Sequence, residues 1–296
     1  MILIEKTQIT GLEPTIRGMR NPMNSWEKSD SGLCKPDSES TIDCANCEFN
    51  CLGSDFYTAQ VSPSDFKIGK ADLNLMLRLA RAGSVDGKFR RMIAVYVDIT
   101  APLYWWKEFD TYKVGTVANS CSTMHKIHAK EFTLEDFSHE HLLGRDCVPD
   151  HAYQNPYDIL DLTIACLNHW REKYLIATKT EEYTGLPAKD IWWQMIQLLP
   201  SSYNQKRTVM LNYEVLANIY QHRRNHKLDE WRELCRWIEG LPYSEIITCN
   251  AHKGEEGEIM ALQAAINKLR YQKWSEEQIT KLLQRAAESA NPNMEV

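Results

Sequence analysis

The sequence predicts an α+β fold, because segments with the pattern of β-strands alternate with segments whose apolar residues recur at helical spacing. Residues 2–9 predict a first strand, which ends at Gly11. Residues 89–99 are rich in β-branched and apolar side chains and predict a second strand. Between them, residues 71–82 predict an amphipathic helix that stops at Gly83. The chain therefore combines strands with helices.

Further helices are predicted along the rest of the chain. They cover residues 103–110, which are rich in aromatic side chains, a segment beginning at Asn155 and Pro156, residues 190–199, a long stretch from about 207 to 239, and two pieces within 255–288. Asn155 before Pro156 is the usual order of a cap residue and a first helical residue. Ser275 with Gln278 has the pattern of a capping box for the last helix.

The predicted elements divide the chain into a domain of residues 1–245 and a C-terminal helical extension of residues 246–296. The domain contains an irregular segment at about residues 21–63, which is rich in Ser, Asp, Pro, Asn and Cys. A loop of that length is unusual inside a compact domain unless it has a function or is held in place. We therefore treat this segment as an insertion.

Four cysteines lie within this insertion: Cys34, Cys44, Cys47 and Cys51. Four thiolates can form a tetrahedral zinc site, for which the Cys44-x-x-Cys47 pair is a familiar half-site, and a closed site would hold the loop together. The second half of the pattern is neither a clean Cys-x-x-Cys nor a His pair, so reduced thiols without a metal remain the alternative, with redox or iron–sulfur chemistry as a third.

The net charge excludes one class of partner. With 34 Lys and Arg against 40 Asp and Glu, the formal net charge is −6, so duplex nucleic acid is not expected to bind.

No run approaches the ~20 apolar residues of a membrane-spanning helix, and no membrane association is expected. The chain starts without a secretory signal pattern. We therefore expect a cytoplasmic protein whose nine Cys are mostly reduced thiols.

If residues 207–239 form one helix, Asn212, Leu216, Ile219 and Arg223 share a face, and His226 lies near the same stripe. Such a face combines aliphatic side chains with hydrogen-bonding groups, which suits the wall of a ligand pocket. The alternative is a subunit interface that contains a paired Arg.

Two segments carry a more specific pattern. Residues 101–127 read APLYWWKEFDTYKVGTVANSCSTMHKI, and Leu199-Pro200 precedes Asn212, which is followed eleven residues later by Arg223. In this order the segments resemble the flavin-dependent thymidylate synthases. That family has Ala-Pro, an apolar helix with a Gln, Arg-His-Arg and Asn-Glu-x-Ser-x-Arg-Tyr, and later Leu-Pro with an Asn and an Arg at the same separation. The resemblance spans about residues 72–238.

The resemblance implies a mixed or antiparallel sheet with a long helix and a helical layer. It also implies roles for individual residues. A catalytic role is expected for Ser122, Glu108 and Tyr112. Contacts with a flavin are expected for Asn212, Asn119, Lys113 and His226, and contacts with the substrate for Arg223, Glu108, Ser122 and Lys107.

The central motif departs from the family pattern. Thr111, Tyr112 and Lys113 stand at the position of Arg-His-Arg, Met124 stands at the last Arg of the motif, and Glu214 replaces the Arg that follows Asn212 by two residues. Each lost Arg removes charge-assisted hydrogen bonds of about 1.5–3 kcal/mol. Nearby cations that can compensate in part are Arg90, Arg91, Lys107 and Lys113.

Glu108 stands where the family has Gln. An ionised Glu accepts hydrogen bonds but donates none, so it suits the exocyclic amine of cytosine better than a carbonyl oxygen. The hypothesis is therefore that the substrate is a cytosine nucleotide. The alternative is that Glu108 forms an ion pair with Lys107 or a nearby Arg.

By resemblance, the expected function is C5 methylation or hydroxymethylation of dUMP or dCMP. The implied cofactor is FAD, with methylenetetrahydrofolate and NADPH as co-substrates, and the implied assembly is a homotetramer to which Trp105 and Trp106 contribute an interface. Because the family does not use a cysteine nucleophile, Cys121 is expected to be a small packed residue. The alternatives are a non-catalytic nucleotide-binding or regulatory protein and an unrelated helical metal protein.

Overall fold

The computed structural model describes residues 2–33, 66–144, 155–179 and 185–249, together with 275, 278, 280 and 281. Two compact units are distinguished, Met1–Thr248 and Cys249–Val296. The first contains the sheet and the helices named below. In the second, the predicted capping box is confirmed: Ser275 N–H donates to Gln278 Oε1 (2.9 Å), and Gln278 N–H donates to Ser275 Oγ (3.2 Å).

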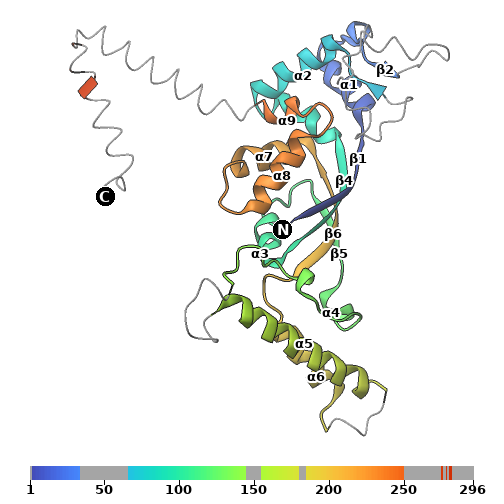
Figure 1. Cartoon of the computed structure of the whole chain (residues 1–296). Coiled ribbons are helices and arrows are strands. Elements are labelled where there is room, and N and C mark those ends of the chain that lie inside the picture. Colours follow the sequence, from blue (N-terminus) through green and yellow to red (C-terminus); the bar gives the residue numbers. More distant parts are fainter. Residues whose placement is uncertain are drawn as a thin grey trace, which may run out of the picture. The chain divides into compact units, whose positions relative to one another are not determined.

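A four-stranded antiparallel sheet forms the centre of the first unit (Figure 1). Its strands are β1 (Leu3–Thr10), β4 (Ala94–Pro102), β5 (Val117–Ser120) and β6 (Asn204–Asn212), in the spatial order β1-β4-β6-β5. Each neighbouring pair is antiparallel. The predicted α+β fold class with an antiparallel sheet is confirmed.

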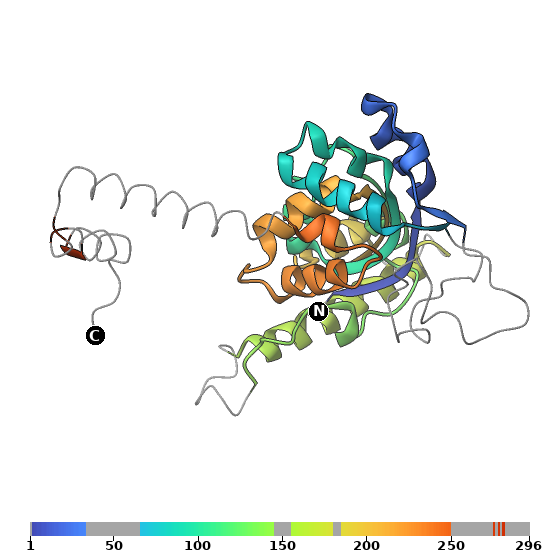
Figure 2. The same cartoon turned by 90° about the horizontal axis from the view of Figure 1, so that it is seen from above.

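One face of the sheet belongs to the hydrophobic core. Val95, Val97 and Ile99 of β4 are at most 1% exposed, and they alternate with the exposed Tyr96 and with the polar Asp98. Successive side chains of a strand point to opposite faces, so this alternation separates a covered face from an open one. Figure 2 shows the helices α7 (Tyr213–Arg223) and α8 (Asp229–Glu239) together on one side of the strands.

Several predicted helices are confirmed with small changes at their ends. They are α2 (Lys70–Ala82), α3 (Leu103–Phe109), α5 (Pro156–Ala177) and α6 (Ala188–Leu198). The side chain of Asn155 accepts hydrogen bonds from the backbone N–H groups of Tyr157 and Asp158, as expected of a cap residue. Gly83 follows α2 at φ 123°, a conformation that favours glycine.

The turn after β1 also depends on a glycine. Gly11 has φ +92°, and a Cβ atom there would lie 2.2 Å from the carbonyl oxygen of Met92. The chain then enters α1 (Leu12–Arg20), followed by the short 3₁₀ helices η1 (Asn21–Met23) and η2 (Trp26–Lys28). The end of the first strand at Gly11 is thus explained by the space and the backbone angle.

The prediction of one long helix over residues 207–239 was wrong. Residues 204–212 form β6, which pairs with β4 along its whole length, from Ala94 opposite Asn212 to Pro102 opposite Asn204. Asn212 then caps α7 by accepting a hydrogen bond from the N–H of Val215, and α7 is separated from α8. Pairing with β4 on one side and β5 on the other overrides the local helical pattern, because the two ladders provide hydrogen-bond partners for the backbone of β6.

The predicted strand at residues 89–99 was wrong in its first half. Residues Asp86–Met92 form the 3₁₀ helix η4, and strand pairing begins only at Ala94. Phe89 and Arg90 of η4 are 3% exposed. Phe89 and Arg90 therefore enter the core from a helix, and the strand continues further than expected, through Pro102.

The predicted irregular segment at residues 21–63 is described only in its first part. Beyond η2, Gly32–Leu33 form β2, which pairs with β3 (Phe66–Lys67). The four cysteines proposed as zinc ligands, Cys34, Cys44, Cys47 and Cys51, lie outside the described residues. Within the described ranges, no group of three or more His, Cys, Asp and Glu side chains is arranged to hold a metal ion.

A second hydrophobic cluster lies under the pair of helices α5 and α6. Near it are the short helices α4 (Thr123–Lys126) and η5 (Leu134–Asp136). Its buried members are Ile127, Phe132, Phe137, Leu160, Leu167 and Met195.

Among the residues with a described structure, no helix has the length and apolar character needed to cross a bilayer.

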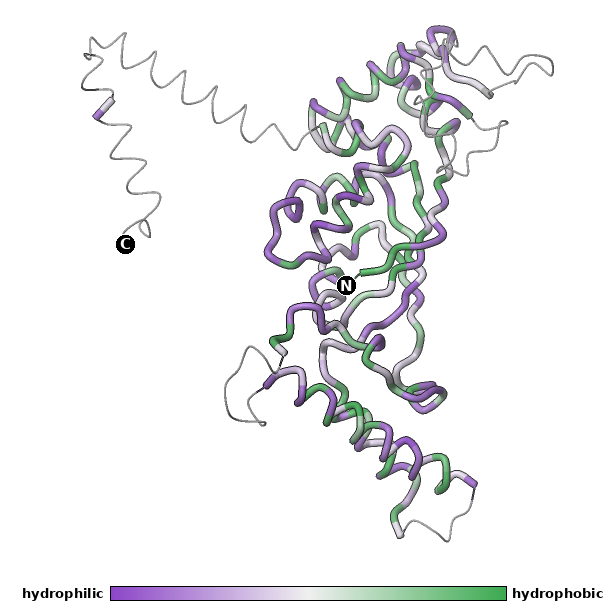
Figure 3. The backbone as a smooth tube through the Cα atoms, in the orientation of Figure 1, coloured by the Kyte–Doolittle hydropathy of each residue, from purple (hydrophilic) through white to green (hydrophobic). Residues whose placement is uncertain are grey.

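Most of α8 is coloured as hydrophilic in Figure 3, yet one stripe of it is buried. The buried apolar residues Trp231, Leu234, Cys235 and Ile238 recur at spacings of three, one and three, which places them on one face of the helix. Burial raises the pKa of the Cys235 thiol to about 12, so this thiol stays protonated and is a packing group. The same stripe brings Trp231 to the functional site.

Candidate functional site

Residues singled out in two distant parts of the sequence meet at one point of the structure. Arg223, the last residue of α7, donates from Nη1 to Oε2 of Glu108 on α3 (2.9 Å). It also donates from Nε to the hydroxyl of Tyr112 (3.0 Å). The side chains of Arg223 and Glu108 remain 21% and 38% exposed. They therefore form an ion pair at a surface that a ligand can reach.

Trp231 and His226 complete this group, which we call the Glu108 cluster: Glu108, Tyr112, Arg223, His226 and Trp231. The indole N–H of Trp231 donates to Oε2 of Glu108 (3.0 Å), and the Arg223 guanidinium lies 4.7 Å from the centre of the indole ring. Nε2 of His226 lies 3.6 Å from the same Oε2. A cation over an aromatic face and two hydrogen bonds to one carboxylate oxygen hold the group in a defined geometry.

A hollow of about 250 Å³ lies beside Tyr112. It is lined by Phe109, Asp110, Tyr112, Lys113, Thr116 and Ala118. The hydroxyl of Thr116 is buried and has no hydrogen-bond partner in the described part of the chain. Lys113 is exposed at this hollow. Of the residues predicted to contact a flavin, Lys113 is the one that lines it.

The other residues predicted to contact the flavin do not gather there. Oδ1 of Asn212 accepts from the N–H of Val215, and its Nδ2 lies 3.5 Å from the carbonyl oxygen of Gly115, so this side chain caps α7. Asn119 lies exposed on β5, opposite Thr208. His226 belongs to the Glu108 cluster. Of the four residues predicted to contact the flavin, Lys113 lines the hollow beside Tyr112, and Asn212, Asn119 and His226 do not.

The predicted ligand wall on residues 212–226 was also wrong. Leu216 and Ile219 are fully buried in the core and cannot contact a ligand. Ser122 is exposed, and its Oγ accepts from the N–H of His125 as the cap of α4. Lys107 is exposed on α3, one residue before Glu108. The structure thus unites Glu108, Tyr112, Arg223 and His226, while Ser122 serves as a helix cap elsewhere.

The cations expected to compensate for lost arginines differ in their surroundings. Arg90 is buried, its Nη2 lies 2.7 Å from Oε2 of Glu214, and its Nη1 donates to the carbonyl oxygen of Ile246 (3.2 Å). It is therefore committed to an internal ion pair. Arg91 is exposed. Lys113, at the hollow, is the better-placed cation for an anionic ligand.

Two further expectations fail. Trp105 and Trp106 are at most 1% exposed and pack edge to face, with ring centres 4.9 Å apart, so they belong to the core of the chain and not to a subunit interface. Cys121, expected as a packed residue, is an exposed free thiol. The apolar character of residues 103–109 reflects burial beneath the Glu108 cluster, where Trp105 contacts Trp231 (4.8 Å between ring centres).

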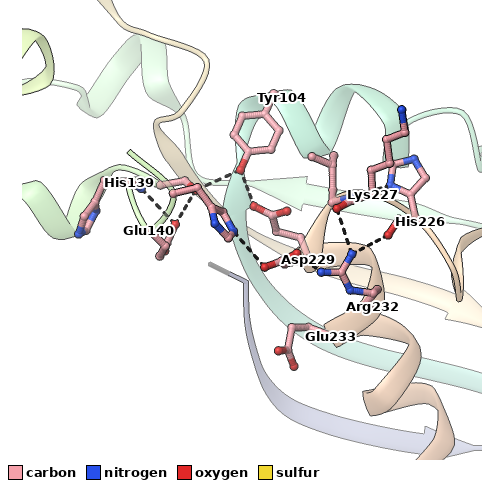
Figure 4. A network of polar contacts seen from close by, with 12 residues as sticks. Tyr104, His139, Glu140, His226, Lys227, Asp229, Arg232 and Glu233 are labelled. Atoms are coloured by element: carbon pink, nitrogen blue, oxygen red, sulfur yellow. Dashed lines mark hydrogen bonds and ion pairs between the residues drawn. The ribbon is translucent and has the colours of Figure 1, made fainter. Parts of the chain in front are cut away.

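A second network of polar side chains joins α3, the loop after η5 and the start of α8 (Figure 4). The hydroxyl of Tyr104 donates to Glu230, which is 5% exposed, and lies 3.1 Å from the hydroxyl of Ser138. Ser138 donates in turn to Glu140 (2.8 Å). Burial, together with the bond to Glu230, raises the pKa of Tyr104 above its ordinary value. Tyr104 therefore stays protonated and acts as a donor.

A second hollow, of about 390 Å³, lies between α4 and the start of α6. It is lined by Met124, His125, His128, Tyr174, Ala188, Lys189 and Trp192. Nδ1 of His128 is buried without a hydrogen-bond partner among the described residues. None of the residues predicted to bind or react lines this hollow. Its lysine, histidines and aromatic rings were not recognised as one site, because they come from three separate parts of the sequence, residues 124–128, Tyr174 and residues 188–192, and only the first overlaps a motif.

Trp231 was the main residue of the site that sequence reasoning missed. It lies within an Asp-Glu-Trp-Arg-Glu run at the start of α8, and no role at a site was predicted for it. The signal becomes visible only in three dimensions, where its N–H meets the carboxylate of Glu108. Buried indoles need a hydrogen-bond acceptor, so its partner is informative.

No family model and no curated protein matches the sequence. A thymidylate synthase X from Helicobacter pylori with FAD and dUMP is a similar solved structure, with a TM-score of 0.49, 12% identity, and coverage of 83% of this chain and 96% of that one. A UMP/dUMP methylase, PolB from Streptomyces cacaoi, bound with 5-Br dUMP, has a TM-score of 0.46 at 11% identity, covering 84% of this chain and 95% of that one.

Proposed function

We propose that the Glu108 cluster binds the base of a pyrimidine deoxynucleotide. The observation that carries the proposal is the direct contact between Glu108 and Arg223, two residues that the motifs assign to the substrate and that lie 115 positions apart. The contact puts a hydrogen-bond acceptor next to a donor at an accessible surface. The edge of a pyrimidine carries donors and acceptors in the same close arrangement.

The hollow beside Tyr112 supports a nucleotide as the ligand. Lys113 offers a positive charge at its rim, and the buried hydroxyl of Thr116 offers a hydrogen bond that no described group uses. A lysine ammonium is a point charge that can donate hydrogen bonds to the oxygens of a phosphate. Tyr112 lines the hollow and also bonds to Arg223, so it connects the hollow with the Glu108 cluster.

The proposed reaction is C5 methylation or hydroxymethylation of dUMP or dCMP. The resemblance of the two sequence motifs supports this reaction. The same resemblance implies FAD as the cofactor, methylenetetrahydrofolate and NADPH as co-substrates, and a homotetramer as the assembly. Reduced flavin would supply hydride when bound. Of the residues expected to hold it, Lys113 lines the hollow beside Tyr112, while Asn212 caps α7.

The alternative is a non-catalytic nucleotide-binding or regulatory protein. Two observations favour it. The charge of Arg223 is balanced internally by Glu108, and Asn212 is occupied as a helix cap. A protein with these contacts would retain base recognition without the flavin chemistry.

The deciding experiment uses the purified full-length chain. Its visible spectrum and the supernatant after denaturation are examined for FAD, and binding of dUMP and dCMP is measured by calorimetry. Turnover is followed by mass spectrometry of the nucleotide in the presence of methylenetetrahydrofolate and NADPH. Lys113→Ala should weaken binding, whereas Lys70→Ala, which replaces an exposed lysine on α2, should not.

Three results are distinguishable. Bound FAD with a nucleotide that gains a one-carbon group supports the enzyme. Nucleotide binding without FAD, even after reconstitution, and without turnover supports the alternative. If neither dUMP nor dCMP binds, both functions are wrong.

A zinc site in the cysteine insertion is a separate proposal. Zinc held by Cys34, Cys44, Cys47 and Cys51 would hold this segment together. Metal analysis of the purified chain, compared with Cys44→Ser and Cys47→Ser, tests it. One zinc per chain that is lost in both variants is the expected result, and a metal-free wild-type chain contradicts it.

A further inference from the structure

The two oxygens of the Glu108 carboxylate have different surroundings. Oε2 accepts from Nη1 of Arg223 (2.9 Å) and from Nε1 of Trp231 (3.0 Å), and Nε2 of His226 lies 3.6 Å away. Oε1 accepts no hydrogen bond from any residue that the structure describes, and the side chain is 38% exposed. One oxygen is thus fully used to hold the carboxylate in place, and the other is available.

Trp231 is placed to fix both members of the ion pair. It is fully buried, its ring packs against Trp105 at 4.8 Å, and Arg223 lies over its face at 4.7 Å. The indole N–H can only donate, and its hydrogen bond to Oε2 of Glu108 orients the carboxylate. A buried ring has little freedom to move, so the position of Oε1 follows from the packing of α8.

The orientation of His226 agrees with this arrangement. Its Nδ1 accepts a hydrogen bond from the backbone N–H of Leu228 (3.2 Å). In the neutral ring the proton then lies on Nε2, the nitrogen that faces Glu108. His226 therefore adds a third N–H on the side of Oε2 and leaves Oε1 untouched.

Arg223 has a matching free group. Its Nε and Nη1 are bonded to Tyr112 and Glu108, and its Nη2 makes no hydrogen bond within the described ranges. A free acceptor, Oε1, and a free donor, Nη2, therefore belong to directly bonded side chains. A phosphate or a carboxylate has no N–H for Oε1 and would be repelled by it, so a heterocycle edge fits this point better than an anion does.

We infer that Trp231 is a positioning residue that aims Oε1 of Glu108 at an N–H of the ligand, beside an acceptor atom that takes a bond from Arg223. The inference rests on the proposed function and narrows it. The edge recognised is N3–H with a neighbouring carbonyl in uracil, or the N4 amine with N3 in cytosine. Methylation of that N–H therefore removes the hydrogen bond to Oε1.

The test compares nucleotides that differ in this N–H. Binding of dUMP, dCMP, 3-methyl-dUMP, N4,N4-dimethyl-dCMP and deoxyribose 5-phosphate to the full-length chain is measured by calorimetry. For the preferred base, the methylated form should bind at least about tenfold more weakly, since a hydrogen bond to a charged group is lost. Trp231→Phe keeps the ring and removes the indole N–H, so the ratio between parent and methylated forms should fall toward one. Binding of deoxyribose 5-phosphate should not change.

Trp237→Phe is the matched control. Trp237 lies on the same helix, and its indole N–H donates to Thr7 Oγ1 (3.0 Å), away from the Glu108 cluster. This variant should keep the wild-type ratio. A general loss of packing would weaken all ligands alike and leave the ratio unchanged, so the ratio separates positioning from a structural role. If Trp231→Phe does not fold, Glu108→Gln tests the same contact: Arg223 and Trp231 hold the amide oxygen in the place of Oε2, so the NH2 group faces the base and the ratio between parent and methylated forms should fall toward one.

The outcomes separate the inference from the function. If dUMP or dCMP binds and its methylated form binds equally well, the recognition of the N–H is wrong and nucleotide binding stands. If the ratio is large in the wild type and unchanged in Trp231→Phe, the positioning role is wrong. If no pyrimidine nucleotide binds, the proposed function is wrong and the inference is overturned with it.

Discussion

The Nε atom of Arg20 lies 2.6 Å from Oδ1 of Asp72, and both side chains are at most 5% exposed. The other carboxylate oxygen of Asp72 accepts from the hydroxyls of Ser29 and Ser31 and from the N–H of Asp30. The ion pair joins the last residue of α1 to α2, and the hydrogen bonds to Asp72 attach residues 29–31 to the same helix. The contacts of Asp72 therefore fix the first part of the cysteine insertion to α2.

Replacement of Asp72 by Asn should destabilise the protein by about 3–5 kcal/mol, because it leaves the buried charge of Arg20 without its partner. Urea unfolding followed by circular dichroism measures the change. Asp86→Asn, at an exposed carboxylate of η4, is the control and should stay within about 0.5 kcal/mol of the wild type. Equal losses in the two variants would contradict the anchoring role.

The free energy of unfolding should also fall in acid, because Asp72 becomes protonated. Burial alone raises the pKa of Asp72, but hydrogen bonds from Ser31, Ser29 and Arg20 outweigh burial and hold the pKa below its ordinary value. A lowered folded-state pKa stabilises the protein above the unfolded pKa of about 4, and this contribution is lost as the pH falls through the folded pKa. Urea midpoints measured from about pH 6 down to about pH 3 should decline more steeply for the wild type than for Asp72→Asn. Parallel curves would disprove the assignment.

The ion pair of the buried Arg90 and the partly exposed Glu214 should behave as a unit. Arg90→Met leaves Glu214 unpaired and should cost about 3 kcal/mol, and Glu214→Met should have a similar effect. In the double variant both charges are gone, so its loss should be smaller than the sum of the single losses by about 0.5–3 kcal/mol. Chemical denaturation of the four proteins gives the coupling energy. Strict additivity would show that the two side chains do not interact.

Asn212 should act on stability as a helix cap. Asn212→Ala removes the acceptor for the N–H of Val215 and should cost about 0.5–2 kcal/mol. Asn212→Ser keeps a capping oxygen and should recover most of this loss. Thermal unfolding of both variants tests the role. If Ser is no better than Ala, the amide of Asn212 has another function, such as contact with a ligand.

Gly115 should tolerate no side chain. Its φ is +77°, and a Cβ would lie 2.7 Å from Nδ2 of Asn212, so Gly115→Ala combines backbone strain with a clash at the cap of α7. A loss of about 1–3 kcal/mol is expected. Gly144→Ala, where a Cβ meets nothing within 4 Å, is the matched control for the thermal unfolding experiment. A neutral Gly115→Ala would show that the loop near Asn212 can rearrange.

Part of the candidate site was predictable because its residues lie in motifs. Glu108 and Arg223 were each singled out by position in a motif, and an ion pair between Glu108 and an Arg was one of the alternatives considered. The role of Trp231 and the pairing of Arg90 with Glu214 were not predictable. Each depends on which faces of separate elements meet, and no spacing within one segment encodes such a contact.

The sequence by itself determined the features that depend on neighbours a few residues away. These include the helix start at Asn155, the capping box of Ser275 and Gln278, and the stops at Gly11 and Gly83. A cap or a left-handed backbone angle involves only adjacent groups, so its signal is local. The same locality explains why the α+β class was predictable from strand and helix patterns.

Only the tertiary structure decided that residues 204–212 are a strand and that Oε2 of Glu108 is surrounded by donors while Oε1 is free. The ladder between β4 and β6 supplies hydrogen bonds from residues about 110 positions away, and this outweighs the helical pattern of 207–212. The Glu108 cluster likewise unites α3, the end of α7 and the first turn of α8. Its chemistry arises from packing between elements, which no single segment of the sequence contains.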